Sequence, residues 1–100
     1  MSVLVTVKVT ADTEAFQKAL ADRGSEFKEI GDRAQGVGAI HHRFGIGDGF
    51  VLVVDEWETA EQFQKFFGDP ELQAFIGTIG GDQTPPEITV TEAVSSPDEF

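Results

Sequence analysis

His41, His42 and Arg43 stand side by side and form the one cluster of titratable nitrogen in the sequence. An imidazole can accept a proton near neutral pH or bond to a ligand oxygen. Adjacent side chains on a strand point to opposite faces, so the two histidines cannot share a site. Alternation places His41 with Arg43 on one face and His42 on the other. The face of His42 is the more apolar one and also carries Ile40, Phe44 and Ile46.

His42 is therefore the candidate catalytic residue, acting as a general base. A histidine among apolar groups can equally be a core residue that bonds to the backbone or to a neighbouring acid, because structural networks also perturb such groups. Arg43 and His41 are candidates for holding an anionic or phenolic ligand. Arg43 can instead pair with an acid across a dimer, and the 18 acidic residues favour that pairing.

Trp57 is the only tryptophan and the second candidate for ligand contact. It ends a predicted strand, and Phe63, Phe66 and Phe67 follow on the next predicted helix. These four side chains are candidates for the walls of a flat apolar pocket that binds a substrate. A tryptophan in a small core can equally serve packing alone.

Asp55 and Glu56 are adjacent on the same predicted strand, so their carboxylates diverge and do not form a catalytic pair. We expect both to be solvated or paired with Lys or Arg. No metal site is expected, because the chain has no cysteine and two adjacent strand histidines are poor metal geometry.

Hydrophobic periodicity indicates the elements that must position these residues. Apolar side chains alternate along strands and recur at helical spacing along helices. Gly24 can split the first helix, and Pro70 opens a new helical segment after the second one breaks at 68–70. The glycines between 45 and 49 predict a hairpin turn. The predicted strands are 3–10, 39–46, 50–57 and 88–94, the predicted helices are 13–36 and 60–79, and 95–100 is a predicted flexible tail.

The order βαββαβ predicts an α+β domain, and the strand 50–57 indicates how it assembles. Its side chains are apolar on both faces, with Phe50, Leu52 and Val54 on one and Val51, Val53 and Trp57 on the other. Two helices cover only one face of a four-stranded sheet. A second sheet is the expected cover for the other face, so we expect a homodimer.

Composition narrows the classes of partner. The formal net charge is -11 and the sequence pI is about 4.3, which disfavours nucleic acid and membrane surfaces as partners. The sequence shows no signal peptide and no candidate membrane span. We expect a cytoplasmic protein.

The βαββαβ order, the segment Asp55-Glu56-Trp57-Glu58-Thr59 and the following helix, broken at Gly68-Asp69-Pro70, resemble the antibiotic biosynthesis monooxygenase-like family. The resemblance runs from Val3 to Val94. It implies a ferredoxin-like fold with a four-stranded antiparallel sheet, and a dimeric α/β barrel domain over residues 1–94.

Members of that family include cofactor-free oxygenases that act on aromatic polyketides or quinones, and haem-degrading enzymes. They often use an Asn beside a Trp, completed by a Tyr or a His. Trp57 matches the tryptophan, but the chain has neither Asn nor Tyr, and Phe67 stands where the haem degraders carry His. The resemblance implies an enzyme or binding protein for a small aromatic or quinol-like ligand, without a cofactor. The alternative is a non-catalytic dimeric interaction or sensing module of the same fold.

Overall fold

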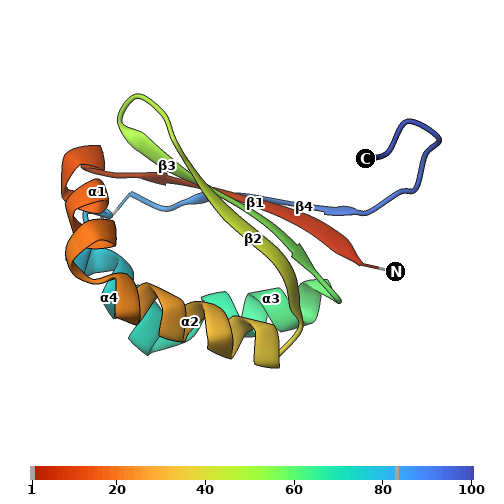
Figure 1. The fold of residues 1–100 in the computed structure, drawn as a ribbon, viewed down its shortest axis with the longest axis horizontal. Coiled ribbons are helices and arrows are strands. Elements are labelled where there is room, and N and C mark those ends of the chain that lie inside the picture. Colours follow the sequence, from red (N-terminus) through yellow and green to blue (C-terminus); the bar gives the residue numbers. More distant parts are fainter. Residues whose placement is uncertain (1, 83) are drawn as a thin grey trace.

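The structure, a computed structural model that describes residues 2–82 and 84–100, has two layers. A four-stranded sheet forms one layer, and all four helices lie on one of its faces (Figure 1). The opposite face of the sheet carries no helix, so this chain leaves it uncovered. The elements are β1 (Val3–Thr10), α1 (Thr13–Asp22), α2 (Gly24–Gly36), β2 (Ala39–Ile46), β3 (Phe50–Trp57), α3 (Ala60–Phe67), α4 (Pro70–Thr78) and β4 (Glu87–Glu92).

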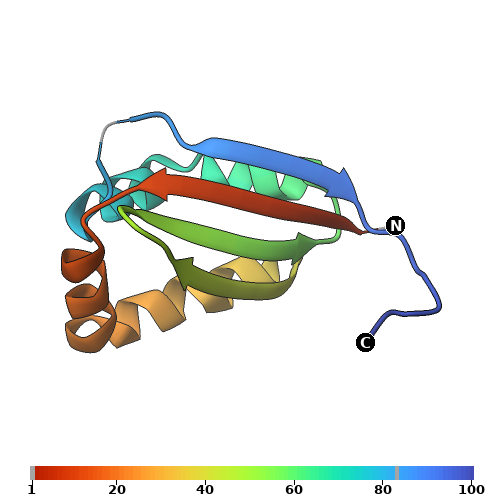
Figure 2. The same cartoon turned by 90° about the horizontal axis from the view of Figure 1, so that it is seen from above.

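The strands follow the order β2-β3-β1-β4, and every neighbouring pair is antiparallel. Figure 2 shows β4 at one edge of the sheet and β2 at the other. This is the ferredoxin-like α+β arrangement that the sequence predicts. None of the helices in the described part of the chain is long and apolar enough to cross a membrane.

The helices begin where the sequence supplies caps. The Asp12 carboxylate accepts hydrogen bonds from the backbone N–H groups of Glu14 and Ala15, both at 3.1 Å, and so starts α1. The Thr59 hydroxyl caps α3 in the same way through Gln62 N–H. The two predicted breaks are confirmed, because α2 begins at Gly24 and α4 begins at Pro70.

One strand boundary was predicted wrongly. The last strand was expected to reach Val94, but β4 ends at Glu92, and Val94 is 79% exposed. β4 pairs only with β1, and Glu92 lies opposite Val3, the first residue of β1. A single further backbone hydrogen bond joins Ala93 to Ser2, at 3.0 Å. β4 stops because its only partner strand stops.

The core beneath the sheet is divided into two clusters of buried side chains. Alternation along β1 and β3 turns one row of each strand toward the helices, as predicted for Val51, Val53 and Trp57. The first cluster comprises Val5, Val7, Ala34, Trp57 and Phe63, and the second comprises Phe16, Ala19, Val51 and Ile79. The cavity described below borders residues of both clusters.

The face of the sheet without helices is partly apolar. Leu4 on β1 and Val54 on β3 are each 46% exposed there, beside the half-buried Phe50 and Leu52. Because side chains alternate, none of these residues can turn inward without breaking the register of the sheet. The monomer therefore presents apolar sheet surface to water.

Two glycines flanking the turn from α2 into β2 differ in what they do for stability. Gly38 has a φ of 119°, and a Cβ there would overlap the Gln62 side chain. Gly36 is helical, and a Cβ there would meet nothing within 4 Å. We expect Gly38→Ala to lower the free energy of unfolding by about 1 to 3 kcal/mol, from the left-handed backbone conformation. Urea unfolding of the purified variant measures it.

Gly36→Ala is the matched control, because alanine is the better residue in a helix. It should raise the free energy of unfolding by up to about 1 kcal/mol. Equal effects of the two substitutions would contradict this account of the turn.

Candidate functional site

A cavity of about 680 Å³ lies between the helices and the sheet. Seven of the nine phenylalanines line it, so its walls are mainly aromatic. At one end Trp57 packs against Phe63 and Phe66, with ring centroids 5.8 and 5.5 Å away. At the other end lie edge-on contacts among Phe16, Phe27, Phe44 and Phe75. The cavity therefore borders both clusters of the core.

The size of this cavity decides how it should be interpreted. An empty sealed cavity costs about 24 cal/mol per Å³, so 680 Å³ would cost about 16 kcal/mol. That cost exceeds the whole stability of most domains, which is about 5 to 15 kcal/mol. The space is therefore open to solvent or a ligand, and its volume lies in the range of small-molecule sites.

Asp55 provides the polar group on the cavity wall. It is only 8% exposed, which was not expected, because the sequence predicted a solvated carboxylate or one paired with Lys or Arg. Asp55 Oδ1 lies 2.6 Å from His42 Nδ1, and Trp57 Nε1 donates to Oδ2 at 3.0 Å. Both carboxylate oxygens thus have a partner, which offsets the cost of burying the group.

His42 is oriented by this contact. A carboxylate only accepts hydrogen bonds, so Nδ1 donates to Asp55 and carries the ring proton. Nε2, the other ring nitrogen, then has a free lone pair, and no described side chain of this protein is hydrogen-bonded to it. The His42 ring lines the cavity, packs edge-on against Phe44 at 4.6 Å, and has 43% of its side chain exposed. The arrangement can accept a proton from a bound molecule.

A β-bulge decides which histidine meets Asp55. Ala39 pairs with Trp57 and His42 pairs with Asp55, so three steps along β2 match two steps along β3. Without the extra residue, the same starting pair would place His41 opposite Asp55. The extra residue is Ile40, which was predicted on the apolar face with His42 but is 42% exposed.

His41 and Arg43 flank His42 and lie opposite Glu56 and Val54, on the alternate face as predicted. Both also border the cavity, at the free edge of β2, and His41 borders a second hollow next to the C-terminal residues. Within its own chain, Arg43 has no ion pair with any described residue. Arg43 thus borders the cavity, while alternation assigns its side chain to the face of the sheet without helices.

The structure brings the predicted site residues to one cavity. Four of them, Trp57 and the three phenylalanines of α3, come from the end of β3 and the helix that follows. Asp55 was missed as a site residue, although its position two residues before Trp57 puts both on one face of β3. The predicted site residues that border the cavity are His41, His42, Arg43, Trp57, Phe63, Phe66 and Phe67.

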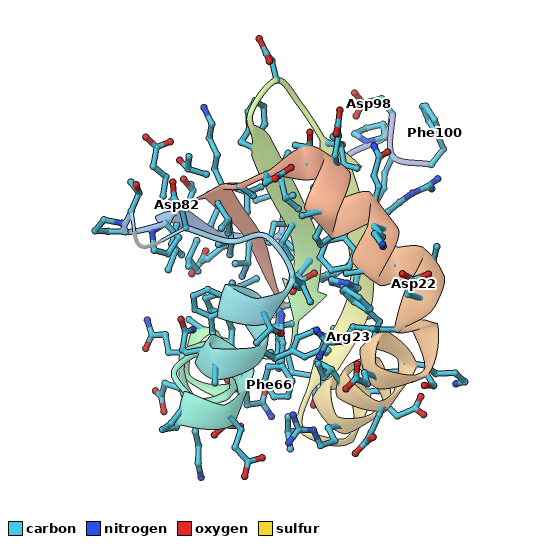
Figure 3. All side chains as sticks on the ribbon, turned by 90° about the vertical axis from the view of Figure 1, so that its left-hand side faces the viewer. Asp22, Arg23, Phe66, Asp82, Asp98 and Phe100 are labelled. Carbon is cyan, nitrogen blue, oxygen red and sulfur yellow. The ribbon has the colours of Figure 1, made fainter. Side chains whose placement is uncertain are left out.

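Two arginines connect the helix pairs across the cavity. Arg23, between α1 and α2, donates to the Thr78 hydroxyl at 2.9 Å and lies over the Phe75 ring. Its hydrogen bond to Glu26 raises the pKa of Arg23 and lowers the pKa of Glu26. Arg33 lies over the Phe66 ring. Figure 3 shows Arg23 and Phe66 reaching from opposite helix pairs into the space between them.

Metal ligation finds no support in this site. In the part of the chain that the structure describes, no three His, Asp or Glu side chains converge as ligands of an ion would.

The comparisons with known proteins give the fold. No protein-family model matches the chain, and no curated protein matches it in sequence. Solved structures do match over nearly the whole chain. A monooxygenase from the gene ActVA-Orf6 of Streptomyces coelicolor, in complex with nanaomycin D, has a TM-score of 0.68 and 19% identity, covering 95% of this chain and 89% of its own.

Two further structures agree. SnoaB, a cofactor-independent oxygenase from Streptomyces nogalater, has a TM-score of 0.65 at 12% identity and covers 98% of both chains. A dimeric ferredoxin-like protein from an uncultured marine organism has a TM-score of 0.64 at 17% identity, covering 99% of this chain and 93% of its own. The predicted fold and the structural resemblance to antibiotic biosynthesis monooxygenase-like proteins are confirmed. At these identities the likeness concerns the fold, so the chemistry rests on this chain's own residues.

The buried Asp55 contacts predict a cost when the carboxylate is removed. Asp55→Ala leaves the Trp57 N–H without its acceptor, and we expect a loss of about 1 to 3 kcal/mol in the free energy of unfolding. Glu58→Ala, which removes an exposed carboxylate three residues away, should change it by no more than about 0.5 kcal/mol. Urea unfolding compares the two variants. Equal costs would contradict the structural role of Asp55.

Proposed function

We propose that this protein is a cofactor-independent monooxygenase that acts on a small aromatic or quinol-like substrate, with His42 as the general base. The observation that carries the proposal is the His42–Asp55 hydrogen bond on the wall of a large, mainly aromatic cavity. A base with a free ring nitrogen faces a space built for a flat apolar molecule. No resident cofactor is needed for the steps that follow.

The first step is proton removal. A substrate phenol or enol binds with its hydroxyl near His42 Nε2, which takes the proton and becomes an imidazolium. Asp55 holds the ring in position and stabilises the charge that develops on it, as an orienting carboxylate does in other acid–base pairs. The substrate anion then carries its negative charge on carbon as well as on oxygen.

The second step reduces dioxygen. The carbanion transfers an electron pair to O2 in one-electron steps, a carbon–oxygen bond forms, and the peroxide takes back the proton from His42. Loss of water from the hydroperoxide breaks the oxygen–oxygen bond and leaves a new carbonyl group. One oxygen atom enters the product and the other leaves as water, so substrate electrons alone reduce O2. The protein supplies orientation and electrostatics.

The remaining cavity residues have binding roles in this proposal. The Trp57 ring, with the phenylalanines of α3, would contact the faces of a planar substrate. Arg43, which has no ion pair with the described residues of its own chain, would hold an anionic or phenolic substituent at the rim, beside His41. The proposed substrate-binding residues are Trp57, Phe63, Phe66, Phe67, His41 and Arg43.

Two kinds of observation favour an enzyme over a non-catalytic interaction or sensing module. A module needs no cavity, whereas this chain keeps one of about 680 Å³ between its helices and its sheet. A module also needs no oriented base, and here a buried carboxylate fixes His42. SnoaB, described as a cofactor-independent oxygenase, and the ActVA-Orf6 monooxygenase share the fold and so support the same general activity.

We also propose that the protein is a homodimer, with a second copy packed on the open sheet face. The exposed Leu4 and Val54 and the half-buried Phe50 and Leu52 supply the apolar surface that a second sheet would cover. A ferredoxin-like neighbour in the comparisons is itself dimeric. The cavity lies on the other side of the sheet, so the helices and not the partner would enclose it.

Ligand binding tests the site. Trp57 is the only tryptophan, so its fluorescence reports the cavity alone. Dithranol, a three-ring hydroxylated anthrone, should quench it saturably at micromolar concentration, which corresponds to about 8 kcal/mol of binding free energy. His42→Ala should weaken binding by about 1 to 3 kcal/mol, because a ligand hydroxyl loses its partner. It should also lower oxygen consumption by at least about 100-fold.

His41→Ala is the control for His42→Ala, because its side chain belongs to the other face of β2. As a residue that binds substrate but takes no part in the proton transfer, His41 should affect KM, and His41→Ala should leave kcat within about twofold of the wild type. If dithranol binds saturably and neither His42→Ala nor His41→Ala changes binding or oxygen consumption, His42 is a packing residue. Failure of dithranol and of simpler quinols to perturb Trp57 would favour the interaction module.

Light scattering tests the assembly. The chain mass is 10.8 kDa, and we expect about twice that mass in solution at micromolar concentration. Val54→Asp places a charge in the centre of the proposed interface and should yield the monomer. Val37→Asp is the control, because Val37 is similarly exposed, at 49%, but lies in the turn between α2 and β2. A wild-type monomer would rule out the dimer.

A further inference from the structure

The two sides of α2 differ in what they face. Lys28, Gly31 and Gln35 follow at spacings of three and four, so they share one side of the helix, and all three border the cavity. Arg33 lies on the opposite side and reaches to 4.0 Å from both Asp69 and Glu71, at the start of α4. The side with Gly31 therefore turns away from α3 and α4, toward the edge strand β2.

The side of α2 toward α3 and α4 is closed at both ends by side chains. Arg23 binds the Thr78 hydroxyl at one end of α2, and Arg33 lies between Phe66 and the two acids of the α4 start at the other. On the side toward β2, by contrast, no side-chain hydrogen bond or ion pair joins α2 to the strand among residues 2–82 and 84–100. A ligand passing between α2 and β2 would therefore break no side-chain hydrogen bond or ion pair of the described residues, whereas one passing between α2 and α4 would.

Solvent reaches the cavity on this same side. β2 is an edge strand, so no further strand covers it. The His42 side chain is 43% exposed although its partner Asp55 is only 8% exposed. In Figure 1, α2 and β2 meet at the turn that joins them and diverge toward the hairpin. His42, which borders the cavity and is partly exposed, therefore lies on the strand that forms one side of this space.

Gly31 is the unusual residue at this opening. Glycine is unfavourable inside a helix and usually needs a reason, such as close packing. Close packing does not explain Gly31, because a Cβ there would meet nothing within 4 Å. Gly38 shows the contrast, since a Cβ there would overlap Gln62. Because residue 31 is a glycine, this part of the cavity border has no side chain.

We propose that substrate enters the cavity between α2 and β2, and that Gly31 sets the width of this entrance and hence the size of substrate admitted. The proposal rests on the proposed function for the nature of the substrate. A planar molecule of three fused rings has a larger outline than a single ring, so its passage depends more on the size of the opening. Gly31 is then a specificity-determining residue that touches no reacting atom.

Stopped-flow fluorescence of Trp57 tests the entrance. Gly31→Leu should slow the association of dithranol by at least about tenfold, because a side chain narrows the opening, and slow that of hydroquinone by no more than about threefold. Gly36→Leu is the matched control. It makes the same change in the same helix, where a Cβ also meets nothing within 4 Å, but Gly36 does not border the cavity. It should leave both rates unchanged.

The outcomes separate the entrance from the function. Wild-type dithranol rates in Gly31→Leu, or equal slowing in Gly36→Leu, would overturn the entrance while leaving the proposed function standing. If dithranol does not bind the wild type, the proposed function fails, and acrylamide decides the entrance. Its quenching of the buried Trp57 should then fall in Gly31→Leu but not in Gly36→Leu. Circular dichroism checks that each variant folds. If Gly31→Leu does not fold, Gly31→Met places a side chain at the same position and takes its place.

Discussion

The Asp55 carboxylate sits beneath the sheet, where an ion needs a hydrogen-bond partner for each oxygen. Its two partners, His42 and Trp57, come from the two strands that form the hairpin, and each satisfies one oxygen. This requirement also fixes the positions of the groups that satisfy the carboxylate. It holds the imidazole against the cavity wall, gives the indole N–H an acceptor, and joins the edge strand to its neighbour. The same contacts that stabilise the fold orient the candidate base.

The helices that cover this site are interrupted at two places, between α1 and α2 and between α3 and α4. The helices that cover the cavity are four short ones, with interruptions at Arg23 and near Asp69. These two breaks put a cation and an anion at helix ends, where they reach across to the opposite helix pair. The interruptions thus supply the groups that connect the walls of the cavity.

The sequence predicted most of the fold because each element carries a local signal. The alternating valines of β1, the caps of α1 and α3, and Pro70 at the start of α4 act within a few residues of where they stand. The faces of β3 and the residues around the cavity followed from the same periodicity. These predictions did not require knowledge of distant contacts.

What sequence reasoning missed depends on contacts between distant segments. The burial of Asp55 requires His42, thirteen residues away, in a register that a bulge at Ile40 adjusts. Local alternation shows that Asp55 and Trp57 share a face of β3, but it does not show that the Asp55 carboxylate is buried on that face. The end of β4 was wrong for a similar reason, because it is set by where β1 begins.

The divided core has a consequence for the life of the protein in a cell. A ligand in the cavity would contact rings from both clusters at once, and it would bind the folded chain but not the unfolded one. At a hundredfold excess over its Kd, such a ligand adds about 2.7 kcal/mol to stability. That is a large share of the total for a domain of this size. Proteases act on transiently unfolded chains, so the cellular abundance of this protein would rise and fall with the supply of the molecule it binds.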